Sequence, residues 1–215
     1  MKAAAANSNK NRLENDRSPN YQLPNGSTAA NMKRDLLIFR DGNQTTVPLD
    51  VPLLDGEQGN MQTLDAMAQI VIEDRIKPDI RKFVLREIVG DIHGHDAKGE
   101  VQRIFEFAQK EITYRSDPFN VERVADVWSI MYALSPGEPE GDCGIKSIFI
   151  ASCCAVLGHK PFFVVAKQRQ NQAAFNHVYN AVLIDGQMKY YDATPEDKPA
   201  GWQLPAWETK FYKIF

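Results

Sequence analysis

Residues 140–167 read EGDCGIKSIFIASCCAVLGHKPFFVVAK and place a turn, an apolar helix and a strand in that order. The segment SPGEPEG at 135–141 is rich in Gly and Pro, which marks a turn. We expect a helix from about residue 142 to Val156, ended at Leu157-Gly158 with Gly158 as the residue after the cap. The aromatic and β-branched run at 162–167 then predicts a strand.

Two more strands are predicted at 176–184 and 188–194, joined by a two-residue turn at Asp185-Gly186. Upstream, apolar residues at helical spacing predict helices from Thr63 to the break at Pro78, from Ile80 to about Val89, and over 98–114. Residues 53–62 and 90–97 are expected to be loops, and 35–51 to be a hairpin turning at 41–43. Helices followed by an antiparallel sheet indicate an α+β fold.

The chain divides into three expected parts. Residues 1–32 are polar and have little to bury, so we interpret them as a flexible arm that orders on a partner. Residues 33–60 carry the hairpin and a linker, and residues 61–215 are expected to form one domain.

Composition excludes several classes of function. A net charge of −3 and a pI near 5.8 give no electrostatic basis for binding nucleic acid. We expect no membrane span, because no apolar run reaches the length a bilayer requires, and no signal peptide, because residues 1–20 lack an apolar core. Three cysteines do not make a disulfide framework, which favours synthesis in a reducing cytoplasm.

The motif IVGDIHGHD at 88–96 resembles the first metal-binding motif of metallophosphoesterases. A two-metal site needs about six ligands, whereas the motif supplies two and the later Gly141-Asp142 lacks the partners that family adds. The preceding segment also has helical rather than strand periodicity. We therefore interpret 90–97 as a loop in which Gly90 ends a helix and Gly94 allows a turn, with adventitious Zn²⁺ or Ni²⁺ binding by His93 and His95 as the alternative.

A second constellation is more complete. Cys143 stands at the first turn of the predicted helix, where unpaired N–H groups and the helix dipole should lower the pKa of its thiol. His177 begins a strand and Asp192 lies on the next, so the hairpin should place the carboxylate within reach of the imidazole. Taken singly, each has an ordinary explanation: a structural cysteine, a satisfied polar residue and a turn former. Together they predict a Cys143–His177–Asp192 triad.

The remaining reactive and aromatic residues have structural interpretations. Cys153 and Cys154 fall in mid-helix and are expected to be buried packing residues. Trp128, Trp202 and Trp207 are expected to be core or lid residues rather than a cofactor site.

These motifs resemble the transglutaminase-like, papain-type cysteine enzyme superfamily. The shared features are Gly-Asp-Cys opening a helix, Leu-Gly-x-x-Pro leading into a strand, His at a strand start, and Asp-x-Thr on the next strand; they cover residues 98–195. The resemblance implies Cys143 as nucleophile, His177 as general base and Asp192 as its orienter, with no cofactor or metal. Members of the superfamily often have acidic residues just after the cysteine, whereas this chain has Gly144, Ile145 and Lys146. The positive charge of Lys146 would support a thiolate; alternatively, the change indicates a non-catalytic site. The side-chain donor to an oxyanion is open, with Trp128 and Gln109 as candidates.

The order of the upstream helices and the closing PAGWQLP resemble phage-encoded members found among head-to-tail or tail proteins. This resemblance implies a virion-associated protein made in the host cytoplasm. Its arm would bind other virion or assembly proteins, and its site would act on a peptide or peptidoglycan-like amide by hydrolysis or acyl transfer. The alternative is a purely structural assembly protein in which the triad is not catalytic.

Overall fold

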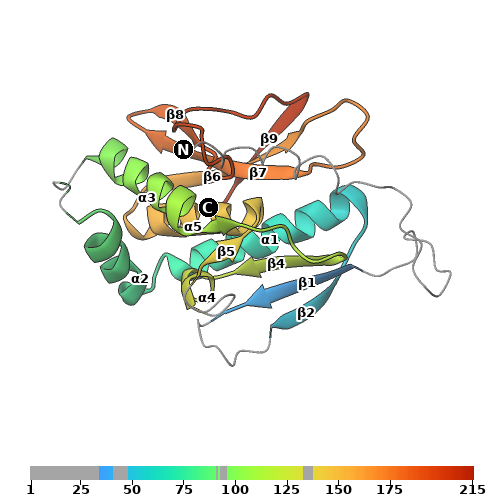
Figure 1. Cartoon of the computed structure of the whole chain (residues 1–215), viewed down its shortest axis with the longest axis horizontal. Helices are drawn as coiled ribbons and strands as arrows, with labels where there is room; N and C mark the ends of the chain where they lie inside the picture. Colours follow the sequence, from blue (N-terminus) through green and yellow to red (C-terminus); the bar gives the residue numbers. More distant parts are fainter. Residues whose placement is uncertain (1–33, 41–47, 91, 93–95, 133–137) are drawn as a thin grey trace, which may run out of the picture. The chain divides into compact units, whose positions relative to one another are not determined.

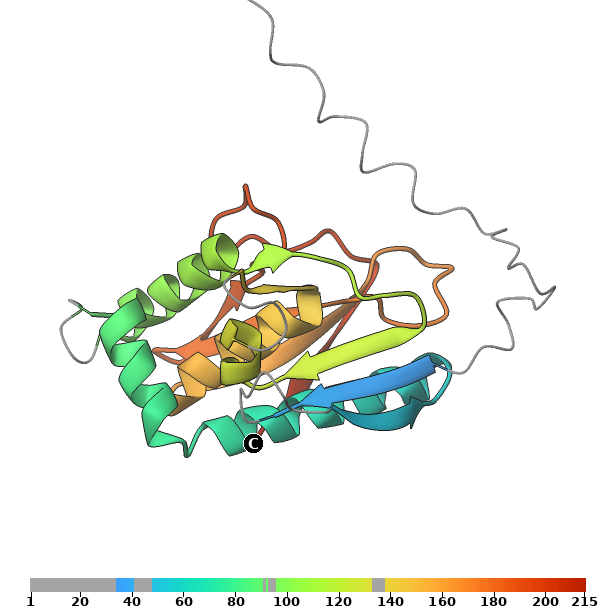
Figure 2. The ribbon, with the colours of Figure 1, turned by 60° about the horizontal axis from the view of Figure 1, so that its bottom comes forward.

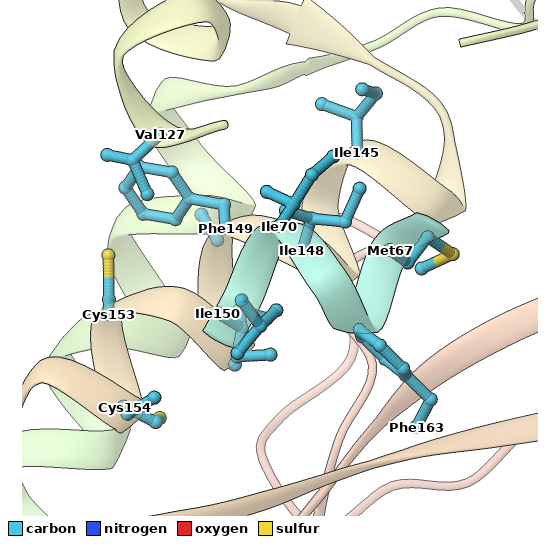
Figure 3. Close-up of a cluster of buried hydrophobic side chains, with 14 of the residues drawn as sticks. Met67, Ile70, Val127, Ile145, Ile148, Phe149, Ile150, Cys153, Cys154 and Phe163 are labelled. Atoms are coloured by element: carbon cyan, nitrogen blue, oxygen red, sulfur yellow. The ribbon is translucent and has the colours of Figure 1, made fainter. Parts of the chain in front are cut away.

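Helix α5 (Cys143–Val156) lies at the centre of the fold (Figure 1), where the apolar sequence predicted a helix. The computed structural model describes residues 34–40, 48–90, 92, 96–132 and 138–215. Every α5 residue after Cys143 is buried, because the helix packs against helices on one side and a sheet on the other. Figure 3 shows Ile148 and Phe149 of α5 together with Met67 and Ile70 of α1 (Gly56–Asp74) in this core.

The sheet beside α5 has four antiparallel strands in the order β8-β7-β6-β9. Their bounds are Lys160–Lys167 (β6), His177–Ile184 (β7), Gln187–Tyr191 (β8) and Glu208–Lys213 (β9). The hairpin turns at Asp185 and Gly186, both with positive φ, which confirms the predicted two-residue turn. The edge strand β9 was not predicted from the sequence; it pairs with β6.

A second sheet has the order β2-β1-β4, from β1 (Arg34–Phe39), β2 (Leu49–Leu53) and β4 (Val121–Ala125). The antiparallel pairing of β1 with β2 confirms the predicted hairpin, although its turn at 41–47 lies outside the described residues. Strand β4 runs parallel to β1, and Figure 2 shows the two side by side. The short strands β3 (Thr113–Tyr114) and β5 (Glu140–Gly141) form a separate pair.

Helix α1 begins at Gly56, so the prediction of a loop over 53–62 and a helix start at Thr63 was wrong. Tertiary contacts stabilise the polar first turns. Gln62 donates to the Pro52 carbonyl at 2.9 Å and accepts from the Leu54 N–H at 3.0 Å, which ties the helix to β2. Gly59 is required there, since a Cβ would lie 2.0 Å from the Leu54 carbonyl oxygen.

The other helices are α2 (Pro78–Phe83), a π-helical turn η2 (Val84–Ile88), α3 (Ala97–Glu111) and α4 (Val127–Tyr132). The segment before Gly90 is therefore helical, as predicted, and not the strand that a metallophosphoesterase motif follows. Gly90 has φ +36°, which suits the end of a helix. His93, Gly94 and His95 lie outside the described residues. None of the described helices combines the length and apolar character needed to cross a membrane.

Candidate active site

His177 and Asp192 are joined by a hydrogen bond of 2.8 Å between Nε2 and Oδ2. The ladder between β7 and β8 ends at the pair Asn180 and Tyr191, so His177 and Asp192 both lie just beyond it. Their side chains are 9% and 1% exposed, which protects the hydrogen bond from water. Because an ionised carboxylate only accepts, Asp192 selects the tautomer with the proton on Nε2 and leaves Nδ1 as the basic nitrogen.

Cys143 is the first residue of α5 and lies in the same pocket as His177. Asp142 caps the helix, with Oδ1 accepting from the Ile145 N–H at 3.1 Å. The Val178 backbone N–H donates a hydrogen bond to the Cys143 sulfur. The close packing also requires glycine before the cap, because a Cβ on Gly141 would lie 2.3 Å from the Ile145 side chain.

The pocket has a volume of about 400 Å³, and most of its walls come from segments remote from the motifs. Helix α1 contributes Asn60 and Thr63, and the three-stranded sheet β2-β1-β4 contributes Arg34 from β1 and Glu122 from β4. The Asn60 amide also donates to the Phe175 carbonyl at 2.6 Å, which fixes the segment before His177 against α1. Sequence reasoning missed these walls, since no local pattern marks a contact between β4 and the start of α5.

The electrostatic environment of Cys143 differs from the expectation. Burial and the carboxylates of Asp142 and Glu122 raise the pKa of the Cys143 thiol well above its usual value, and the Val178 hydrogen bond lowers it by less. The prediction that the helix start lowers this pKa was therefore wrong. The main reason is burial of the thiol, and the capping carboxylate of Asp142 adds to it because it opposes the positive end of the helix. With its pKa raised in this way, the Cys143 thiol is neutral near pH 7.

The carboxylates near Cys143 also act on one another. Single oxygens of Asp117, Glu122 and Asp142 lie within 4.8 Å of each other. Burial, followed by the negative charges of nearby carboxylates, raises the pKa of Glu122 to about 8 and the pKa of Asp142 to about 6. Such spacing would suit a cation that binds carboxylates. However, Asp117 already accepts hydrogen bonds of 2.5 and 2.6 Å from Arg123, and Asp142 caps helix α5.

We expected Lys146 to support a thiolate at Cys143, but its side chain points its charge elsewhere. Its side chain is buried, and Nζ donates to the Ala193 carbonyl at 3.0 Å. Burial lowers the pKa of Lys146 to about 8, while the charges of Glu196 and Asp192 raise it. The Lys146 ammonium group therefore interacts electrostatically with Asp192.

Neither residue suggested as oxyanion donor lies in the pocket. Gln109 donates to the carbonyls of Pro195 and Lys198 at 2.6 and 2.8 Å. Trp128 donates from Nε1 to Asp79 at 2.6 Å and lines a different crevice, on α2, η2, α3 and α4. The next three N–H groups of the helix are already occupied: those of Gly144 and Ile145 bind the Asp142 carboxylate, and that of Lys146 binds the Asp142 carbonyl. The Cys143 N–H is therefore the better candidate to donate to an oxyanion.

The predictions for the other cysteines are confirmed, since Cys153 and Cys154 are fully buried and free. Trp128 is half-buried against the core, and Trp202 is half-buried beneath Lys198. Trp207 is 63% exposed and is not a core residue.

No protein-family model matches the chain, and no curated protein does. Among solved structures, a proposed cysteine protease from Cytophaga hutchinsonii is similar at 17% identity and a TM-score of 0.43, over 66% of this chain and 51% of that one. A proposed protease from Parabacteroides distasonis is similar at 12% identity and a TM-score of 0.44, over 82% and 33%. A TGase is similar at 13% identity and a TM-score of 0.34, over 69% and 36%. The matched length is thus between a third and half of each of these larger proteins.

Proposed function

We propose that the protein is a thiol-dependent amide hydrolase or acyltransferase of transglutaminase-like type, with Cys143 as nucleophile. The observation that supports it most is the buried His177–Asp192 hydrogen bond of 2.8 Å in a pocket that also contains the Cys143 side chain. A buried carboxylate that orients an imidazole beside a nucleophile is the arrangement that general-base catalysis requires.

The neutral thiol determines the order of proton transfer. Nδ1 of His177 accepts the Sγ proton as sulfur attacks the carbonyl carbon of an amide, and Asp192 stabilises the imidazolium that forms. The Cys143 N–H and the start of α5 stabilise the oxyanion. The imidazolium then donates its proton to the leaving amine, and a thioester to Cys143 remains. Water completes a hydrolysis, and a primary amine completes an acyl transfer.

The experiment presents the folded protein with a mixture of peptides, with and without a primary amine, and identifies products by mass spectrometry. New carboxyl termini indicate hydrolysis, and amine adducts indicate transfer. Both should disappear in Cys143→Ala. Cys153→Ala, which removes a cysteine from the same helix outside the pocket, serves as the matched control and should keep the products. Products that persist in Cys143→Ala would refute the assignment of the nucleophile.

The alternative is an assembly protein whose triad is inactive, and the raised pKa of Cys143 favours it. Thiol reactivity separates the two. An activated site predicts that Cys143 reacts with iodoacetamide faster than Cys153 and Cys154 in the folded protein. Equal rates for all three cysteines would support the structural role.

We further propose that the protein is virion-associated and that residues 1–32 dock it on another particle protein. Support comes from the phage-like order of segments and the polar composition of 1–32. Deleting 1–32 should abolish incorporation into particles while the thermal unfolding of the remaining chain is unchanged. Particles that incorporate the shortened protein normally would refute this role.

A further inference from the structure

Lys146 is a buried charged residue beside the site that the proposed mechanism does not use. It lies one helical turn after Cys143 on α5, and only 1% of its surface is exposed. Its Nζ donates to the carbonyl oxygen of Ala193, at 3.0 Å. Ala193 directly follows Asp192, so this hydrogen bond links the helix of the nucleophile to the segment that carries the carboxylate.

The segment that follows β8 and begins with Asp192 is held in place by hydrogen bonds from side chains such as Lys146. Strand β8 ends at Tyr191, so no strand ladder holds Asp192. Within the described chain, side chains hold this segment instead. Lys146 binds the Ala193 carbonyl, and Gln109 binds the Pro195 carbonyl at 2.6 Å. The Thr194 N–H donates to Asp192 Oδ1 at 3.1 Å, which leaves Oδ2 for His177.

The link is also electrostatic. An apolar side chain of similar length would fill the same volume without the cost of burying an ammonium group. The charged groups that act on Lys146 are Asp192 and Glu196, both in the segment it holds. The ammonium therefore supplies a positive charge beside the carboxylate that orients His177.

We propose that Lys146 is a positioning residue of the Cys143–His177–Asp192 site, which holds the Ala193 carbonyl and thereby sets Asp192 against His177. This inference rests on the proposed function for its kinetic consequence, but its structural part stands on the hydrogen bond to Ala193 alone. It explains why a lysine stands where a charged side chain is costly.

The experiment compares Lys146→Met, which keeps the length and removes the charge and donor, with Lys146→Arg, which keeps both. Ser152→Ala, a change to another buried polar residue of α5, is the control. In Lys146→Met, kcat should fall on the order of tenfold to a hundredfold with little change in KM, the loss expected for a catalytic group displaced by about 1 Å. Lys146→Arg should recover part of the rate, and Ser152→Ala should retain it.

A pH profile adds a readout that a merely structural role would not move. Since the pKa of Lys146 is lowered to about 8, the rate should change through pH 8 as the ammonium loses its charge. The profile is measured in the Glu122→Gln background, because Glu122 also titrates near pH 8 in the pocket, and Lys146→Met should remove the step there. A folded Lys146→Met with the wild-type kcat and pH profile would overturn the proposal. If Lys146→Met does not fold, Lys146→Gln, which retains a donor without the charge, decides it by the pH profile: the step through pH 8 should disappear, and a step that persists would overturn the proposal.

A spectroscopic readout separates this inference from the proposed function. The ring N–H proton that His177 shares with Asp192 should give a downfield proton resonance in the wild-type protein and in Ser152→Ala. The resonance should weaken or shift in Lys146→Met, whether or not the protein turns over a substrate. An unchanged resonance would overturn the positioning role, whereas a loss of activity on Cys143→Ala tests the nucleophile alone.

Discussion

His177 Nε2 and Asp192 Oδ2 lie 2.8 Å apart at the open end of the β7–β8 hairpin, and both side chains are almost fully buried. The turn at Asp185-Gly186 brings the two strand ends together in a fixed register, and the ladder stops at Tyr191, one residue before Asp192. The hydrogen bond leaves only Nδ1 of His177 for the pocket that contains Cys143.

Replacing the carboxylate should disable the histidine without unfolding the protein. In Asp192→Asn, the amide can donate to Nε2 and favour the wrong tautomer, so turnover should fall by about ten-thousand-fold. Steady-state kinetics and circular dichroism would measure rate and fold together. An Asp192→Asn protein that keeps full turnover would show that His177 is oriented by other groups.

Neutralising the helix cap should activate the thiol. Asp142→Asn keeps a good N-cap and removes the carboxylate that raises the pKa of Cys143, so this pKa should fall. Each unit of that fall increases the thiolate fraction about tenfold, and alkylation of Cys143 at pH 8 should accelerate accordingly.

At pH 5 the wild type and Asp142→Asn should react alike, because the pKa of Asp142 is about 6 and its carboxyl is then protonated. Asp142→Ala is the control for capping and should also cost about 1 kcal/mol of stability. Equal alkylation rates for wild type and Asp142→Asn at pH 8 would contradict the electrostatic explanation.

Stability should depend on pH through Glu122. Its pKa is raised from 4.5 to about 8, so the folded state binds more protons than the unfolded state between these values. The contribution of Glu122 to stability is therefore greatest below pH 4.5 and is lost as pH rises toward 8. Thermal melts of wild type and Glu122→Gln from pH 5 to 8 would measure it, and the variant should show the flatter curve. Parallel curves would count against the raised pKa.

The approach of Gly141 to Ile145 predicts a steric coupling. Gly141→Ala would place a Cβ 2.3 Å from the Ile145 side chain, an overpacking that costs about 1–3 kcal/mol in urea unfolding. Ile145→Gly removes the Cβ and both Cγ atoms that conflict with the new Cβ but leaves a cavity. The double variant should be more stable than the sum of the two single losses implies, since relief of the clash couples the sites. Strict additivity would show that the backbone around Gly141 relaxes instead.

Sequence alone determined the local elements on which the site stands. The apolar run of α5, the Asp185-Gly186 turn and the order of Cys143, His177 and Asp192 are short-range patterns, and each element formed near its expected position. Capping and turn geometry depend on residues a few positions apart, so they can be recognised in a sequence.

Tertiary structure decided the environment of Cys143. The parallel pairing of β4 with β1 brings Glu122 and Arg34 to the pocket, and contacts with β2 extend α1 back to Gly56 so that Asn60 lines the same pocket. The pKa of Cys143 follows mainly from burial, then from the neighbouring cap Asp142, and to a smaller extent from Glu122 on the distant strand β4. Such effects depend on distance in space, and a linear pattern does not encode which distant segments enclose a side chain.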